Sequence, residues 1–229
     1  ELTDYFNSIS DTNHIVDFPI PSTAILSSAF HYRVTNVSTS KRNIFNWYSS
    51  FETSGALLGI IKGNDGPFTT KLGNAFLAQF VRAESDLRYT RKLGTDLFWA
   101  NRFYIGVGYP YGNSLFLPFP RQFIIGGANS LRGFVPRKLG PGSTQATEEQ
   151  QTAYPQIGGD YKLEMNTELR FPFLGRLKGA VFFDAGNTWL MNDSTFTHKP
   201  GGKFTSKFLN QLAVDAGVGL RLDITLFVI

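Results

Sequence analysis

The sequence has no cysteine, few charged residues and no long apolar run. The lack of cysteine among its 229 residues excludes disulfide bonds and thiolate metal sites within the chain. Asp, Glu, Lys and Arg make up 17% of the residues, below the roughly 25% of typical soluble domains. No apolar stretch approaches the ~18 residues that a transmembrane helix requires. A net charge of +4 without a run of lysine or arginine argues against nucleic-acid binding.

The beginning of the chain lacks the pattern of a secretion signal. The first ten residues, ELTDYFNSIS, have neither a basic start nor an apolar core, so we expect no signal peptide in this chain. No segment has a convincing helical period, and neither a linker nor a second domain is apparent. We therefore interpret residues 1–229 as one domain, or as part of one.

Apolar and polar residues alternate along most of the sequence, which predicts strands with one apolar face. In residues 161–171, YKLEMNTELRF, every second side chain is apolar except Thr167, and the side chains between them are charged or amides. Such a polar row cannot lie against a dry core. The segment 212–229 continues the alternation well beyond the ~5–6 residues of a typical strand. The further candidate strands, about eight in all, are residues 23–37, 46–59, 75–89, 97–109, 121–127 and 177–189.

The predicted class is all-β and antiparallel, and two architectures fit it. One is a transmembrane barrel with a polar lumen, and the other is a soluble barrel or sandwich. The long strands, the polar inner face and the aromatic residues near strand ends favour the membrane barrel. A bilayer admits no open sheet edge, so about eight strands either close a small barrel or belong to a larger one.

A long loop separates two groups of these strands. Residues 126–160 have no strand pattern, and loops of this length are uncommon unless they are functional. Within GGANSLRGF, Gly133 would let the backbone beside Arg132 approach another surface closely. The Arg132 guanidinium matches a carboxylate, and alternation places Glu168 and Asp184 on the inner face of adjacent strands. On the residues alone, a solvated arginine and two carboxylates in contact with water are favoured, because exposed ion pairs are weak.

Three motifs resemble one known family. FIIGGANSLRGF (residues 123–134) is similar to the arginine–glycine–aromatic motif in the sixth extracellular loop of the BamA/TamA outer-membrane assembly family. NTELRFPF (166–173) and FFDAGNTW (182–189) resemble the strands that follow it, in the same order and at similar spacing. The resemblance is strong over residues 123–229 and weaker before them. The residues that carry it are Leu131, Arg132, Gly133 and Phe134 in the loop, Glu168 and Asp184 as lumen carboxylates, and Phe183, Gly186 and Asn187 on the motif strand.

The resemblance implies a sixteen-stranded barrel in the bacterial outer membrane, preceded by POTRA domains. The loop would enter the lumen, where Arg132 would pair with Asp184 and Glu168. The family inserts other barrel proteins into the membrane through a weak seam and uses neither a cofactor nor a catalytic side chain. The implied partners are outer-membrane lipid, nascent β-barrel proteins and accessory lipoproteins, with no nucleic acid and no small-molecule substrate. This chain lacks a POTRA-like segment and early barrel strands, so we expect it to hold the middle and later part of the barrel.

Other functions have less support. A two-partner secretion transporter has a similar inserted loop but exports one dedicated substrate, and a soluble β-barrel binding module remains an alternative. We expect no metal and no catalysis, because His14, His31 and His198 are isolated and match no metal-site spacing. Glu168 and Asp184 could imitate a hydrolase pair, but the nearby arginine favours a structural ion pair.

Overall fold

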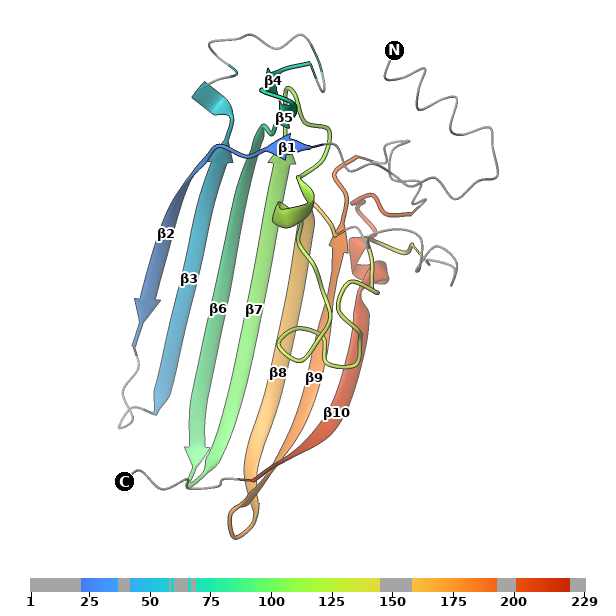
Figure 1. Cartoon of the computed structure of the whole chain (residues 1–229). Coiled ribbons are helices and arrows are strands. Elements are labelled where there is room, and N and C mark those ends of the chain that lie inside the picture. The colour runs from blue at the N-terminus through green and yellow to red at the C-terminus, as the bar shows by residue number, and fades with distance from the viewer. Residues whose placement is uncertain are drawn as a thin grey trace.

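Seven strands form one antiparallel sheet in the computed structural model, which describes residues 22–36, 42–57, 59, 66, 69–144, 158–192 and 201–222. The strands are β2 (Ser27–Thr35), β3 (Asn43–Ser54), β6 (Phe80–Gly94), β7 (Leu97–Pro110), β8 (Tyr161–Leu174), β9 (Leu177–Trp189) and β10 (Ala213–Leu222). They lie side by side in the order β10-β9-β8-β7-β6-β3-β2 (Figure 1). Within the described residues β2 and β10 are the edges of the sheet, which does not close on itself.

Shorter elements lie beyond one end of this sheet. The strands β1 (Thr23–Ala24), β4 (Lys71–Leu72) and β5 (Ala75–Leu77) form a separate small sheet in the order β1-β5-β4. Two short 3-10 helices, η1 (Phe119–Arg121) and η2 (Phe208–Gln211), lie in the connections after β7 and β9. None of the helices in the described part of the chain is long and apolar enough to cross a membrane.

The connections at the two ends of the sheet differ in length. Tight turns join β6 to β7 and β8 to β9 at the lower end in Figure 1, where Asp96 and Gly175 have φ values of 57° and 56°. The connection from β7 to β8 leaves from the opposite end and returns along the sheet. Short turns at one end and long loops at the other are typical of outer-membrane barrels.

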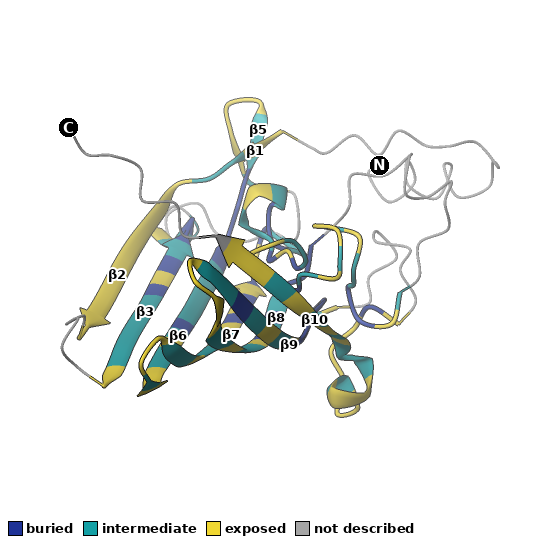
Figure 2. Ribbon diagram, turned by 90° about the horizontal axis from the view of Figure 1, so that it is seen from below, coloured by how far each residue is buried: buried dark blue, intermediate teal, exposed yellow. Residues whose placement is uncertain are grey.

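The two faces of the sheet have the polarity predicted from the alternation. The apolar face is exposed, and it includes Trp99, Phe103, Ile105, Val107, Met165, Leu169, Val181, Phe183, Val214, Val218 and Leu220. The other face holds buried polar side chains, among them Glu52, Asp86, Lys162, Glu164 and Asp184. The view along the strands in Figure 2 places the long loop on this second side. The prediction of antiparallel β-structure with a polar inner face is confirmed.

One predicted strand is wrong. Residues 121–127 contribute only a single β-bridge, between Phe123 and Gly159. Gly126 and Gly127 have φ values of 97° and 96°, a left-handed conformation that ends any extended run. Phe123 and Ile125 instead belong to the loop that begins directly after β7, and they pack against the inner face of the sheet, while Ile124 is exposed.

Several predicted strand boundaries also require correction. The strand predicted at residues 46–59 ends at Ser54, because Gly55 has a φ of 68°. The strand predicted at 75–89 is two strands, β5 and β6, divided at Ala78 and Gln79. The strand predicted at 23–37 is likewise divided into β1 and β2. Residues 145–157 of the predicted loop and 223–229 of the last predicted strand lie outside the described residues.

Candidate functional site

Two glycines on the inner face of β7 make room for the loop. A Cβ at Gly106 would lie 2.4 Å from the ring of Phe123, and one at Gly108 would lie 2.3 Å from Leu117 Cδ1. Leu117 and Phe123 are only 0% and 3% exposed. The loop therefore packs its apolar side chains directly on the strand backbone, and this brings its next residues down along the sheet.

The segment after Phe123 folds into a compact turn. The Gly127 N–H is shared between the carbonyl oxygens of Leu131, at 3.1 Å, and Phe134, at 2.8 Å. The Ser130 hydroxyl accepts the Gly126 N–H at 3.1 Å. Leu131 is completely buried. The turn thus fixes the backbone on both sides of Arg132 and directs its side chain toward β8 and β9.

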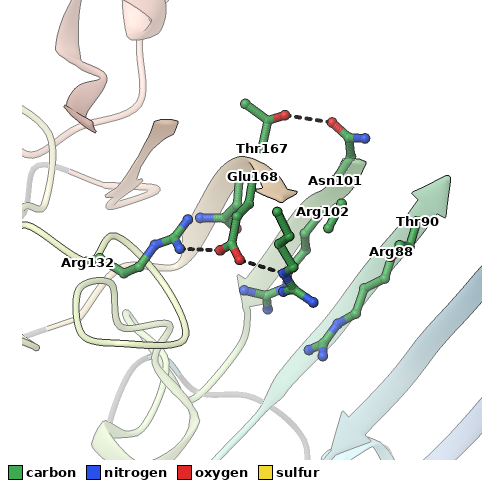
Figure 3. A pocket seen from close by; sticks show the side chains of 10 residues that line it. Arg88, Thr90, Asn101, Arg102, Arg132, Thr167 and Glu168 are labelled. Atoms are coloured by element: carbon green, nitrogen blue, oxygen red, sulfur yellow. Dashed lines mark hydrogen bonds and ion pairs between the residues drawn. The ribbon is translucent and has the colours of Figure 1, made fainter. Parts of the chain in front are cut away.

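Arg132 lies within hydrogen-bond distance of both carboxylates that the sequence singled out. Its Nε and Nη2 each donate to Asp184 at 2.8 Å, and its Nη1 donates to Glu168. The Arg132 backbone N–H also donates to Asp184 Oδ2, at 3.2 Å. The guanidinium lies over the ring of Phe182, 3.6 Å from its centroid. Figure 3 shows Arg132 and Glu168 pointing toward each other from the loop and from β8.

The charges of this cluster are balanced. Asp184 has a fully buried side chain and also accepts a hydrogen bond from Asn166 Nδ2 at 3.0 Å. Glu168 is shared with Arg170, whose Nε lies 2.6 Å from Glu168 Oε1. The hydrogen bond with Asp184 is the main cause that raises the pKa of Arg132 above its ordinary value. Two guanidiniums and two carboxylates therefore form a neutral cluster that connects the loop to two strands.

A second cluster, which the sequence did not predict as a unit, lies beside the first. Arg102 on β7 donates to Asp86 on β6 at 3.0 Å and to Glu164 on β8 at 2.5 Å. Its Nη1 also donates to the backbone oxygen of Asn129 in the loop, at 2.8 Å. Alternation indicated the inward direction of Arg102 and Glu164, but not which strands would be neighbours across the long loop.

The other predicted motif residues have different roles. A Cβ at Gly186 would lie 2.6 Å from Leu163 O and 3.0 Å from Ile125 Cδ1, so the loop and β8 both need a glycine there. Asn187, near the end of β9, donates from its side chain to Gly142 O of the loop at 2.9 Å. Phe183 is 47% exposed on the outer face and does not join the site.

An open hollow lies beside Arg132. Its lining includes Arg88, Arg102, Arg170 and Glu168 (Figure 3). Each of these arginines already contacts a carboxylate. The described residues contain no group of three or more His, Cys, Asp or Glu side chains that could hold a metal ion. The arrangement is therefore suited to holding a loop against the inner face of a sheet by charge-assisted hydrogen bonds.

Comparison with known proteins places the same elements in one family. The sequence profile of the Omp85 superfamily domain matches residues 51–228. The outer membrane protein assembly factor BamA of Neisseria meningitidis serogroup B (strain ATCC BAA-335 / MC58) is 28% identical over 130 residues, in an alignment that covers 49% of this chain. The crystal structure of BamA from Haemophilus ducreyi lacking POTRA domains 1–3 covers 91% of this chain, with a TM-score of 0.58 and 16% identity.

These relatives are much longer than this chain. The matched region is 16% of the Neisseria protein and 40% of the Haemophilus chain. The likeness to the solved structure shows the fold, which is that of an outer-membrane β-barrel. The number of strands in the closed barrel and the presence of POTRA domains remain predictions.

Proposed function

Because the chain belongs to the Omp85 superfamily of outer-membrane β-barrel proteins, we propose that it is the loop-bearing part of a factor that folds and inserts other β-barrel proteins. The observation that supports this most directly is the position of Arg132. The resemblance to the assembly family implies a loop that enters the barrel lumen. Here Asp184 and Glu168 hold the loop against the inner face of the sheet through Arg132.

The two faces of the sheet support the membrane part of this proposal. The outer face carries exposed aromatic and aliphatic side chains that match lipid, while the inner face is polar and covered by the loop. This arrangement disfavours a soluble binding module, because a soluble protein would have to cover so large an apolar surface.

The charged residues of the site have structural roles in this proposal, not catalytic ones. Arg132, Arg170, Asp184 and Glu168 bind one another, so none is available as a general acid or base without breaking the cluster. We propose that the protein is not an enzyme and that its clients are nascent β-barrel proteins. Accessory lipoproteins would join it in the membrane.

Depletion of the full-length protein in its own host tests the proposal. We expect a broad loss of unrelated β-barrel proteins from the outer membrane, measured by mass spectrometry of purified membranes. Arg132→Ala in the full-length protein should reproduce this loss, and Arg137→Ala in the same loop should not. The loss of one secreted protein with an unchanged set of barrels would instead identify a dedicated exporter of the two-partner secretion type.

A further inference from the structure

We propose that Asp215 is a further anchor of the inserted loop and that its side chain leaves no room for a Cβ at residue 133. Asp215 lies on β10, directly opposite Asp184 of β9 in the sheet register. Its Oδ2 accepts the backbone N–H of Gly133 at 3.0 Å, while the backbone N–H of Arg132 is directed at Asp184. Two successive amides of the loop thus bind two carboxylates that face each other across β9 and β10.

The requirement for glycine at position 133 comes from this close approach. A Cβ at Gly133 would lie 2.9 Å from Asp215 Cβ and 3.2 Å from Asp215 Cγ, which is closer than ordinary van der Waals contact. Unlike Gly126 and Gly127, Gly133 does not have a positive φ. Its backbone conformation would therefore accept alanine, and the obstacle is the side chain of Asp215.

The charge of Asp215 explains why the anchor favours a docked loop. Like charges directly opposite each other in adjacent strands are destabilising. In the docked loop, Arg132 neutralises Asp184 and the Gly133 N–H donates to Asp215. The pair of carboxylates is therefore unfavourable in a sheet without the loop and becomes tolerable when the loop supplies a guanidinium and two amides.

The anchor can be tested by following the position of the loop, so the result does not depend on the proposed function. Leu131 is completely buried, and this chain has no cysteine. In the full-length protein, with any other cysteine replaced by serine, Leu131→Cys becomes a reporter. Its reaction rate with a maleimide in native outer membranes measures how often the loop leaves the sheet.

The first comparison tests the steric contact between residue 133 and the side chain of Asp215. In the reporter protein, Gly133→Ala is expected to raise the labelling rate about tenfold, because overpacked contacts cost on the order of 1–3 kcal/mol. Adding Asp215→Gly removes both the Cβ that the alanine would meet and the acceptor for the residue-133 N–H, so the double variant is expected to label at the rate of Asp215→Gly alone. A double variant that still labels about tenfold faster than Asp215→Gly alone would overturn the proposal.

The second comparison separates the hydrogen bond from the size of the side chain. Asp215→Asn keeps an acceptor for the Gly133 N–H but removes the charge opposite Asp184, so it should label only slightly faster than the parent. Asp215→Leu has the same branched shape but no acceptor and should label several times faster. The control is Arg221→Gln, at the other end of β10, which should change nothing. Equal rates for the Asn and Leu variants would refute the anchor, and if the Leu variant fails to fold, the first comparison still decides.

Discussion

Arg102 and Arg132 each hold two carboxylates on the inner face of the sheet, but they reach them from different parts of the chain. Arg102 belongs to β7 and binds the strands on either side, through Asp86 and Glu164. Arg132 comes from the loop and binds β8 and β9. The same chemistry joins strands to one another in the first case and joins a loop to strands in the second.

The two clusters also differ in how many partners each carboxylate has. Glu164 keeps Lys162 at 2.7 Å and Asp86 keeps Arg88 at 2.9 Å if Arg102 is lost. Among the described cations, Asp184 forms an ion pair with Arg132 alone. The carboxylates of the strand cluster therefore each have a second cation, whereas the Asp184 carboxylate depends on a single guanidinium. Arginines that join strands to one another and arginines that join a loop to strands therefore differ in how easily they can be replaced.

The largest expected effect is that of Arg132→Ala. It leaves the fully buried carboxylate of Asp184 without a cation, and breaking a buried pair in this way costs about 3–5 kcal/mol. We expect rapid labelling of a Leu131→Cys reporter and a lower unfolding temperature of the barrel in detergent. The matched control is Arg137→Ala in the same loop, where the guanidinium lies over Phe119. Similar losses in both variants would contradict the special role of Arg132.

Arg102→Ala should have a smaller effect and of a different kind. Both of its carboxylates keep another cation, so we expect a cost of about 2–3 kcal/mol. The unfolding temperature of the barrel should fall, while labelling of the Leu131→Cys reporter should rise far less than in Arg132→Ala, because the loop loses only the bond from Arg102 to Asn129 O and Arg132 still holds it. If the reporter in Arg102→Ala reacts as fast as it does in Arg132→Ala, the two clusters are not separate.

The sequence predicted the strands and the direction of their side chains better than it predicted the contacts of the loop. Alternation was sufficient to place Glu168 and Asp184 on one face, because the side-chain period of a strand is two. It failed at residues 121–127, where Phe123 and Ile125 belong to the loop and pack against the sheet, and two left-handed glycines follow. The same alternation puts Asp215 on the polar face of its strand, but its partner is a backbone N–H, which any residue except proline carries and which leaves no sequence signal.

Gly186→Ala tests whether the loop also requires space in β9. The new Cβ would meet the backbone oxygen of Leu163 and the side chain of Ile125, and we expect a cost of about 2 kcal/mol. The control is Gly219→Ala on β10, where the nearest atom would be Ala180 Cβ at 3.9 Å. The unfolding temperature should fall only in the first variant. An equal fall in both would mean that glycine matters there for a reason other than close packing.

The smallest expected effect is that of Phe182→Leu. The ring of Phe182 lies between the Arg132 guanidinium and β10, where a Cβ at Gly217 would be 2.6 Å from Phe182 Cζ. Leucine keeps apolar cover beneath the arginine but loses the attraction of a cation to an aromatic face, which is worth about 1 kcal/mol. We expect labelling of the Leu131→Cys reporter to rise about fivefold, with both ion pairs of Arg132 retained. Phe182→Tyr keeps the aromatic face and should behave like the parent. If leucine releases the loop as completely as Arg132→Ala does, then the ring, and not the two carboxylates, carries most of the anchoring.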